Sequence, residues 1–482
     1  MWGSPIVTDP VLQQCVHPEC GRRYGLTEVV FRCRACGGLL DVRYDWEKLK
    51  APSSLSFFER RWRRGSSSRE QALDVSGVWR FRELLPFARP EHVITLGEGQ
   101  TLLQRADGLA PHLGLSAGRL MLQYEGLNPS GSFKDNGMTA AFTVARMLGR
   151  RRVACASTGN TGASMAMYAA AAGGGPPMQA IVLIGSGKIA CGKLAQTLDY
   201  GALTLQIEGD FDACLRRVVE AADRLNLYLM NSMNPFRLEG QKAIMYRVLE
   251  GCAWEPPDWI VVPGGNLGNC SAFGKAFEEL HTLGLVARVP RLAVINAAGA
   301  NALYKLYHNR GIRWNGGHWR RDAVDAYYAE CDATGRRART LASAIEIGRP
   351  VNLSKALRAL ELMNGVVRQV SDEEILDHRA LVGRFGFGCE PASAAAVAGL
   401  HQLVREQIIG RDERVVCVLT GHQLKDAETI VGYHAGVGAR ESAGTGATPR
   451  AAGPWSNAPR SVPDRLEDII EVLESAGPEN PA

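Results

Sequence analysis

Glu125-Gly-Leu-Asn-Pro-Ser-Gly-Ser-Phe-Lys134-Asp-Asn-Gly-Met138 is the stretch of sequence that decides the fold. It follows a predicted strand at 119–125, bends through Asn-Pro and Ser-Gly, and brings Lys134 to the start of a predicted helix. The positive end of a helix dipole favours the neutral amine, which is the form that makes a Schiff base with an aldehyde. Taken alone, a lysine at a helix start is usually a solvated surface residue, so the surrounding loops decide how Lys134 is interpreted.

Short apolar runs alternate with amphipathic stretches along most of the chain. The runs predicted as strands lie at 119–125, 153–157, 180–185, 203–208, 259–263, 291–296 and 414–419. The helices predicted between them include 211–225, 237–250 and 270–283. This alternation is typical of α/β proteins, in which helices cover both faces of parallel sheets. We therefore expect two lobes, each with such a sheet, and ligands in the loops that follow the strands.

Two further loops between a strand and a helix are rich in small residues. One is Ala156-Ser-Thr-Gly-Asn160-Thr-Gly-Ala-Ser164, and the other is Val262-Pro-Gly-Gly-Asn-Leu-Gly-Asn269. Glycines let backbone N–H groups approach an anion, and the helix N-terminus adds its dipole. Either loop alone is also consistent with an ordinary tight turn, because a single glycine-rich loop is weak support for a phosphate site.

Two polar segments complete the set. Leu419-Thr420-Gly-His-Gln-Leu-Lys-Asp426 follows the last predicted strand, and Asn231-Ser-Met-Asn-Pro-Phe-Arg237-Leu-Glu-Gly-Gln-Lys242 opens a helix with Arg237 in its first turn. An arginine fork with neighbouring donors suits a phosphate monoester. The alternative is a surface arginine at an ordinary helix start.

Ser130-Gly-Ser-Phe-Lys134-Asp135 resembles the lysine motif of fold-type-II enzymes that use pyridoxal phosphate (PLP). With its flanking residues, and with the segment around Arg237, the sequence resembles the threonine synthase family in particular. Leu96-Gly-Glu-Gly-Gln-Thr101 and Cys389-Glu-Pro-Ala-Ser-Ala394 agree with that family. The resemblance covers roughly 90–430, and it departs from the usual pattern at Leu102, where Pro is usual, and at Gln423, where Gly is usual.

The resemblance implies a role for each matching residue. Lys134 carries PLP as a Schiff base, Asn160 contacts its phenolic oxygen, and Thr420 offers a hydroxyl to its pyridine nitrogen. The PLP phosphate is expected at Gly265, Asn266, Leu267, Gly268 and Asn269. The phosphate of the substrate is expected at Ser157, Thr158, Thr161, Asn231, Ser232, Arg237 and Asn269.

The implied reaction converts O-phospho-L-homoserine and water to L-threonine and phosphate, by γ-elimination followed by addition of water at Cβ. Lys134 is the expected base for the Cα proton. The nearest alternative is a PLP-dependent threonine or serine dehydratase, which shares the cofactor loops but has no need for the Arg237 segment. A binding protein with a nucleic-acid-binding ribbon and a relic core is a second alternative. The intact Lys134 and Thr420 disfavour it.

Four cysteines near the N-terminus have the spacing of a zinc ribbon. Cys15 and Cys20 form C-x4-C, and Cys33 and Cys36 form C-x2-C-G-G twelve residues later. Two such thiolate pairs can close a tetrahedral zinc site, with His17 as a substitute ligand. Degenerate ribbons keep this shape without metal, and four packed thiols in a small reduced module are the remaining alternative. The spacing therefore predicts zinc at these four cysteines.

Composition sets the outer limits. The 482 residues are 46% hydrophobic and 22% charged, with a net charge of only +5, so we expect neither nucleic acid nor a membrane as partner. The other cysteines are scattered through apolar stretches, which predicts a reducing, cytoplasmic location. Relatives suggest a homodimer. The expected parts are a ribbon-like module at 12–45, an arm at 46–95, a PLP-binding core at 96–435 with a smaller lobe at about 135–240, and a mobile tail with a terminal helix at 436–482.

Overall fold

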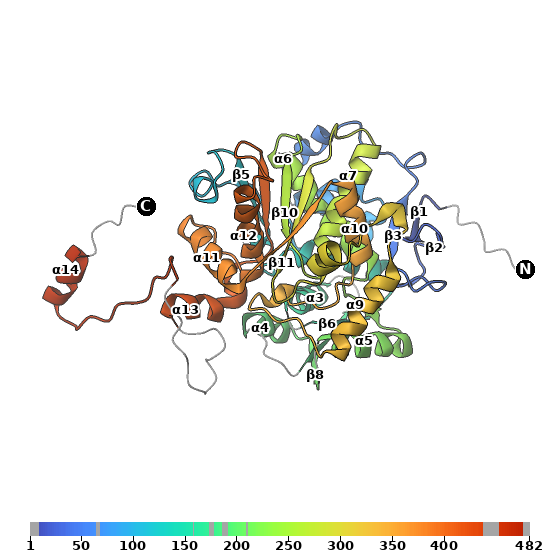
Figure 1. The fold of residues 1–482 in the computed structure, drawn as a ribbon. Coiled ribbons are helices and arrows are strands. Elements are labelled where there is room, and N and C mark those ends of the chain that lie inside the picture. The colour runs from blue at the N-terminus through green and yellow to red at the C-terminus, as the bar shows by residue number, and fades with distance from the viewer. Residues whose placement is uncertain are drawn as a thin grey trace, which may run out of the picture. The chain divides into compact units, whose positions relative to one another are not determined.

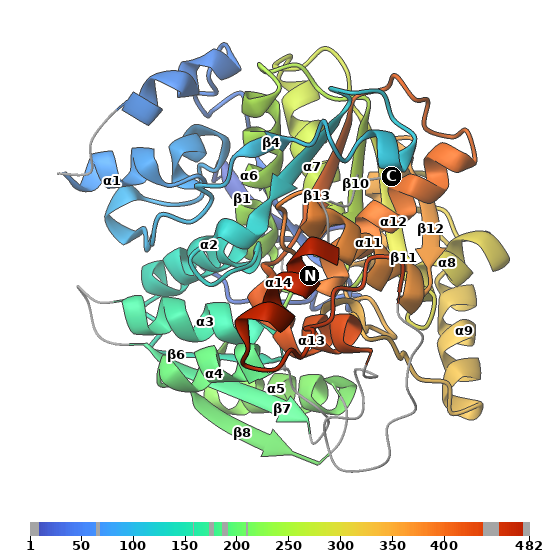
Figure 2. The same ribbon diagram turned by 90° about the vertical axis from the view of Figure 1, so that its left-hand side faces the viewer.

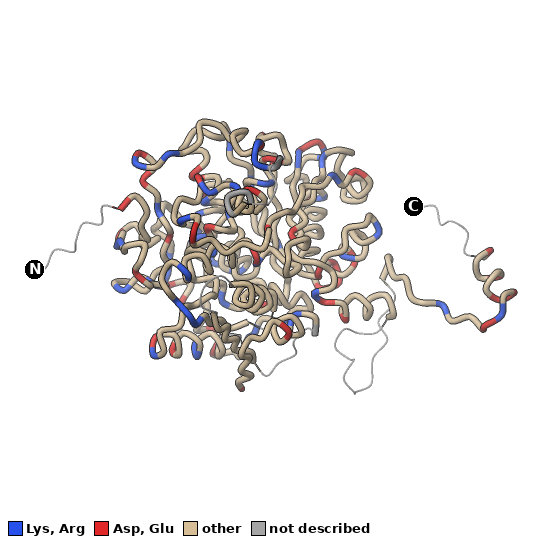
Figure 3. The backbone as a smooth tube through the Cα atoms, turned by 180° about the vertical axis from the view of Figure 1, so that it is seen from behind, with Lys and Arg blue, Asp and Glu red and all other residues tan. Residues whose placement is uncertain are grey.

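The computed structural model describes residues 9–63, 68–157, 159–172, 178–185, 191–208, 211–436 and 453–475. The chain divides into two compact units, Met1–Ala427 and Glu428–Ala482. All three sheets of the described structure and most of its helices belong to the first unit (Figure 1). Among the described residues, no helix is long and apolar enough to cross a membrane. Basic and acidic residues are interspersed along the chain, in keeping with its small net charge (Figure 3).

A six-stranded sheet forms the centre of the first unit. Its strands, in spatial order, are β12 (Val366–Val370), β11 (Arg291–Ala297), β10 (Trp259–Pro263), β13 (Val415–Leu419), β5 (Leu120–Tyr124) and β4 (Leu103–Arg105). All neighbours run parallel except β4, which pairs antiparallel with β5. Every residue of β10 and β13 is buried, because both faces of these central strands are covered.

Helices cover both faces of this sheet (Figures 1 and 2). The helix α12 packs on one face, and α6 and α7 lie on the other, with α2 against α6 and α10 against α7. Their bounds are α2 (Lys134–Met147), α6 (Pro235–Gly251), α7 (Gly268–Thr282), α10 (Leu353–Leu362) and α12 (Pro391–Arg405). The remaining helices of this part are α8 (Ala302–Tyr304), α9 (Arg321–Ala333) and α11 (Asp372–Arg384).

The second sheet is smaller and fully parallel. Its order is β8 (Leu203–Ile207), β7 (Gln179–Gly185), β6 (Arg152–Ala156) and β9 (Tyr228–Leu229). The accompanying helices are α3 (Asn160–Ala171), α4 (Cys191–Asp199) and α5 (Phe211–Leu225). The expected pair of parallel-sheet lobes is therefore confirmed, with β4 as an antiparallel addition at one edge.

The chain before the two sheets forms a small antiparallel sheet and a run of short helices. The sheet has the order β2 (Arg23–Gly25), β1 (Val11–Cys15) and β3 (Leu40–Tyr44). The helices that follow are η1 (Leu55–Arg63), α1 (Arg69–Val75), η2 (Trp79–Leu84) and η3 (Pro90–His92). Val42, Phe58 and Trp79 belong to the same hydrophobic core as α2 and α6, so this region packs as part of the first unit.

All seven strands predicted from sequence are present, within one or two residues of their expected limits. The sequence prediction gave no residue ranges for β4, β9 and β12, which are short or only partly buried. In the second unit, α13 (Ala427–Ala435) is followed by α14 (Leu466–Ser475), which spans most of the helix expected at 461–474. The apolar side chains of α14 are exposed.

Candidate active site

Three of the predicted loops leave neighbouring strands of the large sheet. Lys134 follows β5, Thr420 follows β13, and the glycine loop 264–268 follows β10. These strands lie side by side and run parallel, so their carboxyl ends meet at one edge of the sheet. In the small sheet, Asn160 follows β6 and Asn231 follows its parallel neighbour β9. The topology therefore brings five sequence motifs to the ends of two groups of adjacent strands.

Lys134 begins α2 with its ammonium group 3.9 Å from the centre of the Phe133 ring. Burial, together with the positive charges of Arg237 and Lys193, lowers the pKa of Lys134 to about 7 against the opposing effect of Glu390. A large fraction of Lys134 is therefore the neutral amine near neutral pH. The amine has the protonation state required of a nucleophile or a base.

The loop before Lys134 is held by a buried carboxylate, Glu125. Its two oxygens accept hydrogen bonds at 2.6–2.8 Å from side chains of four segments of the first unit. The donors are Thr101, Gln123, Asn128, Asn136 and Arg247. Burial alone would raise the pKa of Glu125, but Arg247 and these donors outweigh it and lower the pKa. Glu125 stays ionised and fixes the bend that carries Lys134.

Asp135, the residue after Lys134, closes the other side of the loop. Its carboxylate accepts hydrogen bonds from the Ser130 backbone N–H at 2.7 Å, from the Ser130 hydroxyl at 2.6 Å and from the Ser164 hydroxyl. Burial raises its pKa to about 6 despite these donors. Ser164 lies on α3, so this contact ties the lysine loop to the small sheet's first helix.

Asn160 contacts a residue to which sequence reasoning gave no role. Its Nδ2 donates to both oxygens of Glu390, at 2.9 and 3.1 Å, and Lys193 pairs with the same carboxylate at 3.2 Å. All three side chains are buried. Glu390 lies in the Cys389–Ala394 stretch quoted above, but nothing in the sequence indicates that it meets Asn160 from 230 residues away.

Another buried lysine, Lys425, lies beside the lysine loop. Its ammonium donates to the Ser130 carbonyl at 2.8 Å and to the Gln196 side chain. Burial lowers its pKa to about 8. Lys425 belongs to the Thr420 motif, yet sequence reasoning did not single it out.

Thr420 is buried, and its hydroxyl lies 3.0 Å from the hydroxyl of Ser393 at the start of α12. The Thr420 carbonyl accepts from the Phe133 backbone N–H at 3.0 Å, which links this loop to the residue before Lys134. A neutral hydroxyl pair can donate or accept one further hydrogen bond without bringing charge to the site.

The glycine loop begins α7 through Leu267, whose φ of +62° is left-handed. A Cβ on Gly265 would lie 3.1 Å from Ile345, and one on Gly264 would lie 2.7 Å from the Asn296 amide, so side chains are excluded there. Asn352 holds the loop, because its N–H donates to the Asn266 carbonyl and its Nδ2 to the Ser232 carbonyl at 3.1 Å. Asn352 thus joins the glycine loop to the segment before Arg237.

Arg237 is the best-defined anion-binding candidate. Asn234 caps α6 by accepting from the Phe236 N–H at 3.1 Å. Pro235 is the first residue of the helix, so Arg237 lies in its first turn. Arg237 is 2% exposed and donates to the Met230 carbonyl at 2.8 Å. Burial lowers its pKa to about 10, so it stays charged at neutral pH. Within the described ranges, no carboxylate forms an ion pair with it.

Other residues predicted to hold the substrate's phosphate have structural contacts of their own. Asn231 exchanges hydrogen bonds with the Ala156 backbone, at 2.9 and 3.1 Å, and so ties the end of β9 to the end of β6. The Ser157 hydroxyl accepts from the Gly159 and Gly162 N–H groups at 3.1 Å and caps α3. Thr161 begins the same helix in a half-buried position. Thr158 lies outside the described residues.

Several buried polar atoms around these loops have no hydrogen-bond partner in the described structure. They are Asn160 Oδ1, Asn269 Oδ1, Arg237 Nε and Gln241 Oε1. Gln241 lies close to Gly268 and Gly137, between the glycine loop and α2. Burying such groups without a partner costs free energy, so their concentration here is typical of a site for a polar ligand.

The four N-terminal cysteines form a second, separate group. Their sulfur atoms all lie within 4.8 Å of one another. His17, the predicted substitute ligand, lies with Nδ1 3.5 Å from the Cys36 sulfur.

Comparison with known proteins gives a consistent result. Residues 94–421 match the family described as pyridoxal-phosphate dependent enzyme. The chain is 41% identical over 422 residues to threonine synthase of Methanocaldococcus jannaschii, covering 87% of this chain and 94% of that protein. It is 40% identical to threonine synthase of Methanosarcina acetivorans, covering 86% and 92%. The crystal structure of threonine synthase from Escherichia coli has the same fold, with a TM-score of 0.60 and 18% identity over 96% and 99% of the two chains.

Proposed function

The chain belongs to the pyridoxal-phosphate dependent enzymes and, among them, to the threonine synthase family, and from this premise we propose how its residues divide the work. The reaction is that of a PLP-dependent lyase. It turns O-phospho-L-homoserine and water into L-threonine and phosphate. The C–O bond at Cγ breaks and a proton leaves Cβ, after which the hydroxyl group of water adds at Cβ and Cγ gains a proton.

When bound, PLP joins an amine as a Schiff base and withdraws electrons from the carbons beside it. The residues present fit this group. Lys134 supplies the amine, the Thr420 and Ser393 hydroxyls would meet the pyridine nitrogen, and the N–H groups from Gly265 to Asn269 would hold the cofactor phosphate. The left-handed Leu267 and the exclusion of a side chain at Gly265 support this assignment, because both belong to the loop that starts α7.

Lys134 has a second role as a base. A pKa of about 7 lets its amine take the Cα proton of the substrate and release a proton again within one turnover. The hydrogen bonds of Glu125 and Asp135 to the loop around Lys134 would keep the amine in position during these proton transfers. Both carboxylates accept several hydrogen bonds from their surroundings, so we assign the base to Lys134.

Arg237 carries the choice of substrate, and it is the observation on which the proposal rests. A buried guanidinium with an unpartnered Nε and no ion-paired carboxylate among the described residues is costly unless an anion binds there. Its charge acts on Lys134, so an anion at Arg237 would lie within electrostatic range of the Lys134 amine. We assign it the γ-phosphate, whose negative charge rises as the C–O bond breaks.

Glu390 and Lys193 act as positioning residues for Asn160. The Nδ2 of Asn160 is the donor that a phenolate oxygen of the cofactor would need, and it is bonded to Glu390. Lys193 neutralises Glu390 from the other side. We infer that Asn160 shares or exchanges this donor when the cofactor binds, with Glu390 holding the amide near its position.

The proposal is tested by measuring phosphate, threonine and ammonia from purified wild-type enzyme and an Arg237→Met variant. Wild type is expected to release phosphate and threonine in equal amounts from O-phospho-L-homoserine. In Arg237→Met, kcat/KM is expected to fall by about 100-fold or more, with the visible absorbance of the bound cofactor retained. The exposed Arg217, changed to Met, is the matched control and is expected to keep full activity.

Two results would contradict the proposal. Ammonia from serine or threonine without phosphate release would identify a dehydratase. Loss of the cofactor band together with activity in Arg237→Met would remove Arg237 from the substrate site.

We further propose that the chain works in a reducing cytoplasm, as a homodimer that binds small molecules but neither nucleic acid nor membranes. Free cysteines throughout the described part of the chain support the reducing compartment. Size-exclusion chromatography with light scattering tests the dimer.

A further inference from the structure

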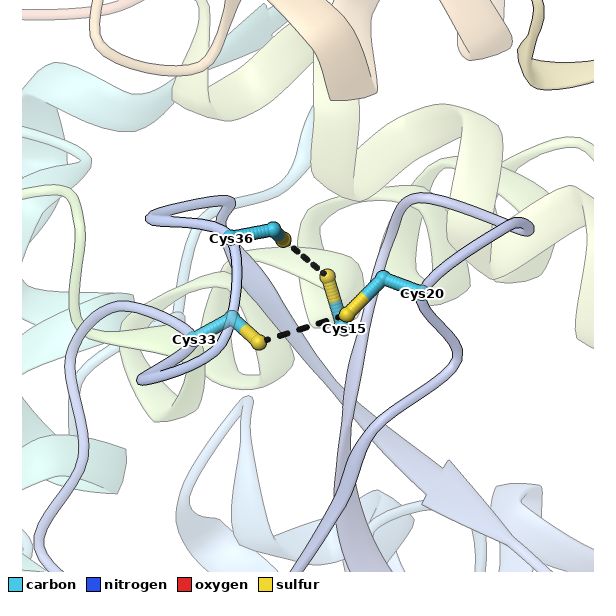
Figure 4. Close-up of side chains that lie close together, drawn as sticks. All are labelled: Cys15, Cys20, Cys33 and Cys36. Carbon is cyan, nitrogen blue, oxygen red and sulfur yellow. Dashed lines mark hydrogen bonds between the residues drawn. The ribbon is translucent and has the colours of Figure 1, made fainter.

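The N-terminal cysteines converge as a metal site would. Cys15 and Cys20 lie on one loop and Cys33 and Cys36 on the other, with their sulfur atoms turned toward one another (Figure 4). The sulfurs of Cys15 and Cys36 are 3.4 Å apart and those of Cys20 and Cys33 are 3.6 Å apart. Zinc bonds sulfur at about 2.3 Å, which puts the edge of a tetrahedral ZnS4 group at about 3.8 Å. The observed spacing is close to that edge.

The two loops are shaped to hold this arrangement. Gly37 has a φ of +68°, and its N–H donates to the Cys33 carbonyl at 2.8 Å, which closes the turn between Cys33 and Cys36. A Cβ on Gly38 would lie 2.5 Å from the His17 ring and 3.2 Å from the Cys15 sulfur, so only glycine fits between the loops. His17 fills the space beside Cys36, which leaves four sulfurs as the metal-facing atoms.

A tyrosine hydroxyl is placed to donate to one of the four sulfurs. The Tyr24 oxygen accepts from the Arg34 N–H at 2.8 Å, so its single hydrogen is available to the Cys33 sulfur at 3.3 Å. Donors to the ligating sulfurs are a regular feature of thiolate metal sites. Arg22, Arg23, Arg32 and Arg34 flank the cysteines in sequence and would offset the double negative charge of a tetrathiolate zinc group.

The cysteine cluster lies beside the first residue of β3, the strand through which the N-terminal region contacts α6, α7 and α10. Cys15 pairs with Leu40, the first residue of β3. Lys355 of α10 donates to the Leu40 carbonyl at 2.6 Å and pairs with Asp41 at 3.0 Å. Lys275 of α7 donates to the Val42 carbonyl at 2.5 Å.

The same strand reaches the helix that carries Arg237. The Tyr44 hydroxyl donates to Glu239 at 2.6 Å, and Glu239 pairs with Lys242 and Lys275. Glu239 is two residues after Arg237 on α6, and Lys275 shares α7 with Asn269. Strand β3 therefore contacts both α6 and α7, the helices that carry the phosphate-binding candidates Arg237 and Asn269.

We propose that Cys15, Cys20, Cys33 and Cys36 bind one zinc ion as four thiolates, and that this ion fixes β3 against α6 and α7. The second half rests on the proposed function, because it predicts weaker binding of O-phospho-L-homoserine when zinc is lost. The first half does not depend on any activity.

Zinc is measured on the full-length protein by plasma mass spectrometry. We expect one zinc per chain in wild type and none in the double variant Cys33→Ser/Cys36→Ser. The control variant Cys331→Ser, changed at a cysteine outside the cluster, should keep its zinc. A wild-type protein that contains no zinc would overturn the proposal, whether intact mass spectrometry shows its cysteines as free thiols or as disulfides. So would zinc retained in the double variant.

A second measurement uses wild type alone and is independent of how the variants fold. A mercurial reagent that titrates thiols should release one zinc per chain, detected with a chromogenic chelator. Zinc-depleted wild type should then show faster hydrogen exchange in β3 and a higher KM for O-phospho-L-homoserine. Unchanged exchange and KM would overturn the coupling to α6 and α7. Bound zinc in a protein that releases no phosphate would leave this site standing and remove the proposed function.

Discussion

Helices α6 and α7 carry two kinds of buried polar group. Toward the N-terminal sheet, Glu239, Lys242, Lys275 and Glu279 form a closed set of ion pairs, two negative with two positive charges. Toward the candidate active site, Arg237, Gln241 and Asn269 each leave a buried atom without a partner. On α6 the two kinds alternate within six residues, because Arg237 and Gln241 share one face and Glu239 and Lys242 the opposite one.

The difference separates structure from function. A buried charge is tolerated at low cost when an opposite charge and hydrogen bonds surround it, as at Glu239. Unpartnered buried groups lower stability unless a ligand completes them. Polarity and burial alone do not tell the two apart, because Arg237 and Lys242 are both buried cations on one helix. Whether the charge has a partner within the chain distinguishes them.

The largest expected effect comes from the residue that both functional arguments require. Lys134→Ala should lower the rate of threonine formation by about 1,000-fold or more, since one change removes the nucleophile and the base. The variant should also fail to acquire the visible absorbance of the bound cofactor. Lys50→Ala, at an exposed lysine, is the control. Threonine formed by Lys134→Ala at an appreciable rate, without added amine, would exclude Lys134 from both roles.

A matched pair on α6 tests the comparison directly. Glu239→Met should lower the free energy of unfolding by about 3 kcal/mol or more, because it leaves Lys242 and Lys275 with only Glu279. Arg237→Met should leave it unchanged or raise it, because an unpaired buried charge is removed. Urea unfolding of the two cofactor-free variants and wild type gives both values. Equal losses in the two variants would mean that Arg237 is a structural residue like Glu239.

The smallest effect is a pH dependence. Burial lowers the Lys134 pKa to about 7, so its neutral form is lost as the pH falls below that value. In stopped-flow mixing of cofactor-free enzyme with PLP, the rate constant of uptake should fall about tenfold per pH unit below 7 and level off above it. Arg237→Met should move this midpoint upward, because the Arg237 charge helps to lower the pKa. A midpoint near that of a solvated lysine would contradict the buried amine.

Local signals in the sequence were sufficient for much of the fold. The uninterrupted apolar runs of β10 and β13 identify buried parallel strands, and the turn residues before Lys134 identify the loop that starts α2. β12 is less distinctive, because Arg368 and Gln369 interrupt its apolar run. β4 and β9 are three and two residues long, too short for a periodic pattern, so only their neighbours in the sheet define them.

The sequence predicted the motifs of the candidate site, but not the hydrogen bonds and ion pairs that position their side chains. Lys134, Asn160, Thr420 and Arg237 stand in motifs that mark them as candidates, and their roles stay predictions. Glu390 gave no comparable signal, because its partners Asn160 and Lys193 are about 200 residues away in the chain. Asn231, which stays a predicted substrate residue, also bonds to the Ala156 backbone, a contact that exists only once β6 and β9 are neighbours.

The sequence by itself determined the family, the alternation of strands and helices, and the order of the chemical loops, since these follow from local pattern and motif. Tertiary structure decided which polar groups are satisfied and which are left for a ligand. Glu239 and Arg237 are two residues apart, but Glu239 meets a charge from α7 and a hydroxyl from the N-terminal sheet, while Arg237 meets a backbone carbonyl. Pairing depends on segments distant in sequence that come together only when the chain folds, and no local pattern contains it.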